Sequence, residues 1–94
     1  MSTFFMFGKY TPDAIRDIST ERTDEAVKLI ENAGGKIVSM HAVLGEYDLI
    51  ILAEFPDVKE AMKASVGLNM ITGISFSTIP ALPAADFDKM VSEI

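Results

Sequence analysis

The sequence contains no cysteine and a single histidine, His41. Without cysteine the chain has no disulfide bonds, no thiolate nucleophile and no zinc site built on thiolates. One imidazole with scattered carboxylates is also too small a donor set for a transition-metal site. We therefore expect neither a bound metal nor a cofactor.

Basic residues are few: eight Lys and Arg stand against fourteen Asp and Glu, which gives a net charge of −6. They are dispersed along the chain, whereas a nucleic-acid-binding surface needs a basic stripe. No apolar run approaches the roughly 18 residues of a membrane helix, and the start lacks the basic region of a signal peptide. We expect no nucleic-acid partner, no membrane partner and a cytoplasmic location.

Apolar residues, by contrast, are abundant. They make up 49% of the 94 residues, and the mean hydropathy is +0.28. A chain of this length forms one domain, here residues 1–94, with much surface for its volume. An excess of apolar residues in such a domain indicates self-association.

The pattern along the chain predicts alternating strands and helices. Thr11-Pro12 and then Ser19-Thr20 are helix starts, and Gly34-Gly35 is a helix stop. We predict strands at residues 3–10, 36–44, 47–55 and 74–79, and helices at 12–18, 20–33, 57–69 and 84–93. Val58, Ala61, Met62, Ser65 and Asn69 are expected on the inner face of the third helix. The order βαββαβ is that of an α+β, ferredoxin-like fold with an antiparallel sheet, to which residues 84–94 add a C-terminal helical extension.

The predicted sheet is apolar on both faces. Residues 4–7 (FFMF) and 49–53 (LIILA) are continuous apolar runs, yet two helices cover only one face of such a sheet. The terminal helix is too short to cover the other face. A second copy that pairs sheet against sheet is the better solution, so we predict a homodimer or a higher homo-oligomer.

The segment VLGEYDLI, residues 43–50, joins the second and third strands. Gly45-Glu46 fits a two-residue type II′ turn, whose first central residue needs positive φ. This register puts His41 opposite Ile50 and diagonal to Asp48, on the face away from the helices. The helix-covered face is then expected to carry Val38, Met40, Ala42, Leu44, Tyr47, Leu49, Ile51, Ala53 and Phe55.

Over nearly its whole length the chain resembles the GYD-domain proteins, whose G-x-Y-D element is matched by Gly45, Tyr47 and Asp48. The resemblance includes Tyr10-Thr11, Arg22, the paired glycines and the segment 55–57 (FPD). It implies a dimeric α+β barrel and no established activity. A more distant similarity to the ligand-binding domain of leucine-responsive regulators implies an effector pocket at the G-x-x-D hairpin, without the DNA-binding helices.

Four residues are thus candidate ligand-binding residues: His41, Gly45, Tyr47 and Asp48. For His41 with Asp48, a structural hydrogen bond is favoured over a catalytic base and its orienting carboxylate. Tyr47 either closes a pocket or covers the edge of the core, Asp48 either binds a ligand amine or accepts backbone N–H groups of the turn, and Arg22 is expected to be solvated.

These residues leave three functions open. We favour a small homodimeric ligand-binding or regulatory module that holds a modest organic ligand near the GEYD hairpin. The alternative is a cofactor-free enzyme similar to the small monooxygenases of the dimeric α/β barrel class, with a cavity on the His41 face. A purely structural role in an assembly is the third. Whether the protein is an enzyme stays open at this point.

Overall fold

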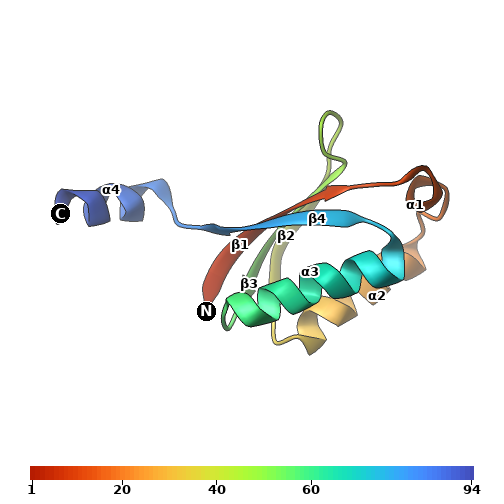
Figure 1. Ribbon diagram of the computed structural model, residues 1–94, viewed down its shortest axis with the longest axis horizontal. Helices are drawn as coiled ribbons and strands as arrows, with labels where there is room; N and C mark the ends of the chain where they lie inside the picture. Colours follow the sequence, from red (N-terminus) through yellow and green to blue (C-terminus); the bar gives the residue numbers. More distant parts are fainter.

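The computed structural model describes residues 1–94, and its elements follow the predicted order (Figure 1). One sheet and a pair of covering helices make up the body, while a short helix stands at each end of the molecule. The elements are β1 (Ser2–Lys9), α1 (Pro12–Arg16), α2 (Thr20–Asn32), β2 (Lys36–Ala42), β3 (Leu49–Phe55), α3 (Val58–Thr72), β4 (Ser75–Ala81) and α4 (Ala84–Ser92).

The four strands form one sheet in the order β2-β3-β1-β4, and every neighbouring pair is antiparallel. This is the predicted ferredoxin-like α+β fold. Helices α2 and α3 lie side by side against one face (Figure 1). Alternate residues of the strands point between sheet and helices and form the core with α2 and α3. The core consists of Phe4, Met6, Ile30, Ile51, Ala53, Phe55, Ala61, Ala64 and Leu68.

Short polar side chains begin the first three helices, as their positions in the sequence predict. Thr11 Oγ1 accepts a hydrogen bond from the N–H of Ala14 at 3.0 Å, and Ser19 Oγ accepts one from that of Arg22 at 3.0 Å. Asp57 accepts from the N–H of Val58 at 2.8 Å. Each bond satisfies a backbone donor that has no partner inside its helix.

Helix α3 differs from the prediction in length and in the side that it buries. It continues to Thr72 and ends at Gly73, which has the left-handed φ of 74° that favours glycine. Its buried stripe is Ala61, Ala64, Leu68 and Thr72, whereas Val58 and Met62 of the predicted inner face are exposed. Two alanines on the stripe let α3 lie close to the sheet, and the larger apolar residues turn outward.

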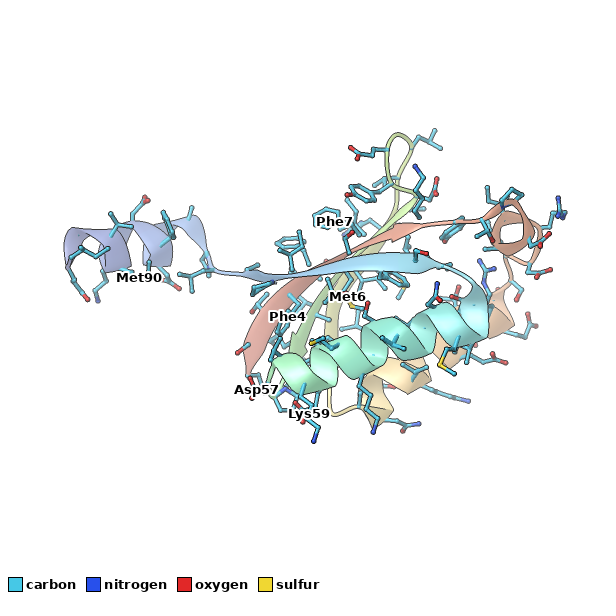
Figure 2. The ribbon with its side chains drawn as sticks, in the orientation of Figure 1. Phe4, Met6, Phe7, Asp57, Lys59 and Met90 are labelled. Carbon is cyan, nitrogen blue, oxygen red and sulfur yellow. The ribbon has the colours of Figure 1, made fainter.

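The second face of the sheet, called the open face here, is not covered by any helix (Figure 1). Its residues alternate with the core residues along each strand. They include Phe5, Phe7, Ile50, Leu52 and Ile79, together with His41 and Ser39. In Figure 2, Phe7 lies above the sheet, on the side opposite the core residues Phe4 and Met6. The middle of the open face is therefore apolar along its two central strands, as predicted, and Thr3 and Glu54 lie at one end of it.

Helix α4 leaves the body at the end of β4 and projects away from it (Figure 1). None of its residues is buried. Its apolar residues Phe87, Met90 and Val91 are each about half exposed, and Ile94 beyond its end is 97% exposed. The helix thus leaves the open face of its own chain uncovered, as expected. No helix of the protein combines the length and the apolar character needed to span a membrane.

Candidate functional site

The loop between β2 and β3 is longer than predicted. The strands end at Ala42 and begin again at Leu49, so the loop spans residues 43–48. Gly45 has a φ of 146°, but no backbone hydrogen bond closes a two-residue turn between Leu44 and Tyr47. The type II′ turn is therefore wrong. The expected pairing of His41 with Ile50 is confirmed. A bulge between Ile37 and Ser39 shifts the register only nearer the start of β2.

Contacts with the end of β1 explain this loop conformation. The N–H of Asp48 donates to the carbonyl of Gly8 at 2.9 Å, and the carboxylate oxygen Oδ2 of Asp48 accepts from the N–H of Tyr10 at 2.9 Å. Lys9 Nζ donates to the carbonyl of Glu46 at 3.3 Å. The loop keeps one hydrogen bond of its own, from the N–H of Val43 to the carbonyl of Asp48 at 2.9 Å, while the N–H and the carboxylate of Asp48 are bonded to Gly8 and Tyr10, far away in sequence.

Tyr47 lies on the open face. Its ring packs against that of Phe7, with centroids 5.1 Å apart and planes inclined by 41°. Phe7 in turn stacks on Phe5, at 6.0 Å between centroids. The prediction that Tyr47 covers the helix side of the sheet is wrong, because the loop leaves strand geometry at Asp48. The same holds for Leu44, which is 101% exposed at the loop tip, and for Val38, which the bulge turns outward.

His41 and Asp48 are not paired. His41 lies on the open face opposite Ile50 and is exposed, while the Asp48 carboxylate is bonded to Tyr10 on the helix side. No hydrogen bond joins the two side chains. A base with its orienting carboxylate is therefore not assembled within one chain. The bond from Tyr10 agrees with the simpler interpretation of Asp48 as an acceptor of backbone N–H groups, although the donor lies just after β1 and not in the turn.

A groove of about 500 Å³, called the loop groove here, runs between α1 and the β2–β3 loop. Asp48 is its one carboxylate. Only Oδ2 of that carboxylate is engaged by the protein, so Oδ1 is available to a ligand. The other walls are mostly apolar: they include Ile15, Ile18, Met40, Val43 and Leu44. The loop groove thus combines an apolar surface with one anionic group.

Arg22 and Tyr10 were not predicted to take part in this region. The Arg22 guanidinium lies 5.5 Å from the centroid of the Tyr10 ring and donates to the carbonyl of Ala14. The expectation that Arg22 is solvated is wrong. Both residues lie among those that carry the family resemblance, and this is the one signal in the sequence that points to them. Their contacts hold α1 and α2 against the end of β1, where the loop groove begins.

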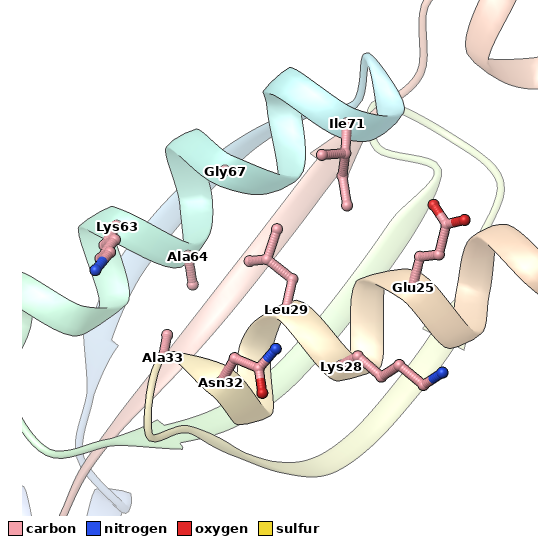
Figure 3. A pocket seen from close by; sticks show the side chains of 9 residues that line it. All are labelled: Glu25, Lys28, Leu29, Asn32, Ala33, Lys63, Ala64, Gly67 and Ile71. Atoms are coloured by element: carbon pink, nitrogen blue, oxygen red, sulfur yellow. The ribbon is translucent and has the colours of Figure 1, made fainter.

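A second groove, also of about 500 Å³, runs along the outer surface between α2 and α3 (Figure 3). Leu29, Ala64 and Ile71 form its floor and one end, with Lys28 and Lys63 at its rim. None of the four candidate residues lines it. Neither groove brings three histidine, aspartate or glutamate side chains together in an arrangement that would hold a metal ion.

The sequence of the chain matches one known protein family. The GYD domain model matches residues 4–91. The protein belongs to the GYD domain family. Within this family fold, the G-x-Y-D element is now seen as the segment that attaches the β2–β3 loop to β1, through the Tyr47 ring and the Asp48 backbone and side chain.

One relative is similar over nearly the full length of both chains. It is a glutamine synthetase and cystathionine beta-lyase binding protein of Thermus thermophilus, 29% identical over 89 residues that cover 92% of this chain and 94% of the relative. At this coverage the similarity includes both covering helices and the β2–β3 loop.

Two solved structures share the fold. The leucine response regulatory protein LrpA of Mycobacterium tuberculosis superposes with a TM-score of 0.57 at 12% identity, over 86% of this chain and 50% of LrpA. A homoserine dehydrogenase from Thiobacillus denitrificans also gives 0.57, at 13% identity, over 84% of this chain and 17% of the enzyme. The chain thus corresponds to one part of each protein. At these identities the likeness shows the fold alone, and it agrees with the predicted similarity to leucine-responsive regulators.

Proposed function

We propose that the protein is a small homodimeric binding module. Two copies pair through their open faces, and each copy holds a small organic ligand in the loop groove beside Asp48. The four candidate residues then have different roles. Asp48 contacts the ligand and Gly45 shapes the loop. Tyr47 and His41 lie where the two copies meet.

The open face carries the first part of this proposal. Phe5, Phe7 and Tyr47 form a continuous aromatic row, with centroid distances of 6.0 and 5.1 Å. Ile50, Leu52 and Ile79 flank the row on the neighbouring strands. Aromatic side chains are enriched where protein surfaces associate, and a contiguous apolar area of this kind is uncommon on a monomer. A second copy presents the same row and covers it.

The loop groove carries the second part. Its volume of about 500 Å³ lies within the range of roughly 300–1,000 Å³ typical of small-molecule sites. Such sites combine apolar walls with a few polar groups that fix the orientation of the ligand. The free Oδ1 of Asp48 is one such group and suits a ligand with an amine or another hydrogen-bond donor.

The Thermus relative supports a binding role of a second kind. Its name describes a protein that binds two metabolic enzymes, and it is matched along nearly its whole length by this chain. We therefore carry a second candidate function, in which the homodimer docks onto a metabolic enzyme such as glutamine synthetase.

The monooxygenase alternative needs a cavity on the His41 face. In one chain that face is open, and the loop groove does not include His41. A substrate cavity there would have to form between two copies. No observation at present favours it over binding.

Native mass spectrometry of the freshly purified protein tests the main proposal. We expect a dimer mass, with a small additional mass that is lost in the Asp48→Ala variant and kept in the matched Glu46→Ala variant. A metabolite screen by thermal shift gives an independent readout. If the protein is a dimer but no metabolite raises its melting temperature, the proposal that the loop groove binds a small ligand is refuted. Binding to immobilised glutamine synthetase or cystathionine beta-lyase then tests the second candidate.

A further inference from the structure

We propose that the ligand is a small zwitterion, whose amine binds Asp48, whose carboxylate binds Arg22, and whose apolar part enters a cavity behind the loop groove. The site rests on the ligand proposed beside Asp48 and extends it, because it adds a second charged residue and names the chemical class of the ligand.

A cavity of about 50 Å³, called the inner cavity here, lies between the sheet and helices α2 and α3. Its lining is mostly apolar and includes Ile51 and Leu68 of the core. Four residues line both the inner cavity and the loop groove: Tyr10, Thr23, Met40 and Leu49. The two spaces therefore adjoin. Voids larger than a water molecule are few in a well-packed domain, so this one is a candidate for occupation.

The size and polarity of the inner cavity indicate what it accepts. A dry protein cavity of about 150 Å³ binds benzene, so a volume of about 50 Å³ suits an apolar group of about three carbon atoms, such as isopropyl. The Thr72 hydroxyl in its wall already donates to the carbonyl of Leu68 at 2.6 Å and accepts from the N–H of Ile74 at 3.1 Å. The inner cavity thus favours the apolar part of a ligand.

Arg22 also lines the inner cavity and has no anionic partner. Its guanidinium carries several N–H donors, and its side chain makes one hydrogen bond, to the carbonyl of Ala14. The single ion pair of the protein joins Arg16 to Asp13, although the chain carries fourteen acidic residues. A half-buried arginine with free donors is suited to bind a carboxylate through two parallel hydrogen bonds.

Tyr10 holds both charged groups. Its backbone N–H donates to Oδ2 of Asp48 at 2.9 Å, and the Arg22 guanidinium lies 5.5 Å from the centroid of its ring. Asp48 and Arg22 are not ion-paired with each other, so each charge is available. A ligand with an amine alone would leave Arg22 unpaired, and one with a carboxylate alone would be repelled by Asp48. A zwitterion gives both residues an opposite charge.

A matched set of compounds tests the class of ligand. Valine, 3-amino-4-methylpentanoate and 4-amino-5-methylhexanoate are zwitterions that share an isopropyl group and place the amine and the carboxylate progressively further apart. 2-Methylpropylamine and 3-methylbutanoate carry the same group with one charge each. Isothermal titration calorimetry of the full chain should show one zwitterion binding at least about tenfold more tightly than either single-charge compound.

Variants of Arg22 assign the carboxylate. Arg22→Met removes the charge and should weaken the best zwitterion at least about tenfold, while 2-methylpropylamine binds as before. Arg22→Lys keeps a positive charge and should recover part of the affinity. Arg16→Met is the matched control, because the Arg16 side chain is 69% exposed and lines neither space; it should change nothing. Circular dichroism checks that each variant is folded.

The inner cavity has a test of its own. Ala26 lines it, and Ala26→Val extends this side chain into the space. The wild type should bind the best zwitterion more tightly than the same compound with hydrogen in place of the isopropyl group. Ala26→Val should remove this preference. A folded Ala26→Val variant that keeps the full preference would overturn the assignment of the inner cavity.

The ligand class and the ligand site fail separately. If 2-methylpropylamine binds as tightly as every zwitterion, equally in Arg22→Met, and is lost in Asp48→Ala, the zwitterion is refuted and the site beside Asp48 stands. If 3-methylbutanoate binds as tightly as the zwitterions, the part of Asp48 is refuted in both. If none of these compounds binds, the zwitterion is refuted, while an added mass in native mass spectrometry that Asp48→Ala loses would still support the loop groove.

Discussion

The Asp48 carboxylate accepts a hydrogen bond from the backbone N–H of Tyr10 at 2.9 Å. These residues lie on opposite sides of α1, α2 and β2 in the sequence, and their bond fixes the β2–β3 loop against the end of β1. The acid of the G-x-Y-D element thus has a structural task that holds whatever ligand the protein binds. This leads to the first prediction.

Asp48→Ala should lower the free energy of unfolding by about 1–3 kcal/mol, because it leaves the N–H of Tyr10 without its charged acceptor. Asp48→Asn keeps an acceptor oxygen at the same place, so it should lower the free energy of unfolding by less than Asp48→Ala does. Urea unfolding followed by circular dichroism measures both. Glu46→Ala is the matched control, since the Glu46 side chain makes no hydrogen bond and only its carbonyl is used. Equal stability of Asp48→Ala and the wild type would refute the task assigned to Asp48.

Phe5→Asp should convert the proposed homodimer into a monomer. Phe5 lies on the open face, where it is 37% exposed in one chain, so a carboxylate is tolerated there in the monomer but is buried without a partner in the pair. Size-exclusion chromatography with light scattering should give twice 10.2 kDa for the wild type and half that mass for the variant. Val66→Asp, on the outer side of α3, should remain a dimer. A dimer mass for the Phe5→Asp variant would mean that the two copies do not pair through the open face at Phe5.

Leu68→Ala should lower the free energy of unfolding by about 2–5 kcal/mol, because it leaves a cavity between α3 and the sheet. Leu68 is completely buried in the core. Met70→Ala, two residues further along the same helix and 80% exposed, should change the stability by no more than about 0.5 kcal/mol. Thermal unfolding compares the two. Similar losses at both positions would mean that a second surface covers Met70.

Two glycines should respond to alanine with opposite signs. At Gly35 an added Cβ would lie 2.5 Å from Cε1 of Phe55, which is buried, so Gly35→Ala should destabilise the fold by about 1–3 kcal/mol. At Gly67, inside α3, the nearest atom is the flexible end of Leu29 at 3.2 Å, which faces the open groove between α2 and α3. Gly67→Ala should therefore stabilise the fold by up to about 1 kcal/mol. Chemical unfolding of both variants tests this difference.

The sequence was sufficient for the fold where the signals are local. Helix starts at Thr11, Ser19 and Asp57, the stop at Gly34-Gly35 and the apolar runs of the strands depend on neighbours in the chain. The order of elements followed from them. The pairing of His41 with Ile50 was predicted instead from a turn centred on Gly45-Glu46, and this pairing is retained although the turn is not of type II′. The inner side of α3 was not predictable, because apolar residues occur on several of its sides and the choice depends on how closely Ala61 and Ala64 let the helix approach the sheet.

The candidate site was predicted only in its location. Turn chemistry at Gly45-Glu46 favours a tight hairpin, but the hydrogen bonds of Asp48 with Gly8 and Tyr10 compete with that turn, and a partner so distant in sequence gives no local signal. The sides of the sheet assigned to Tyr47 and Asp48 changed as a result. The contact of Arg22 with Tyr10 is equally non-local. Ligand binding by the four candidate residues remains a prediction.

The two edge strands of the sheet, β2 and β4, are poorly suited to pair with strands of other chains. Pro80 lies in β4, where it removes a backbone donor, and the bulge between Ile37 and Ser39 interrupts β2. Each edge is thus a poor template for adding another strand. Growth of the sheet from chain to chain, the first step toward fibrils, is disfavoured on both sides, so the association that we propose for the open face would stop at a finite size.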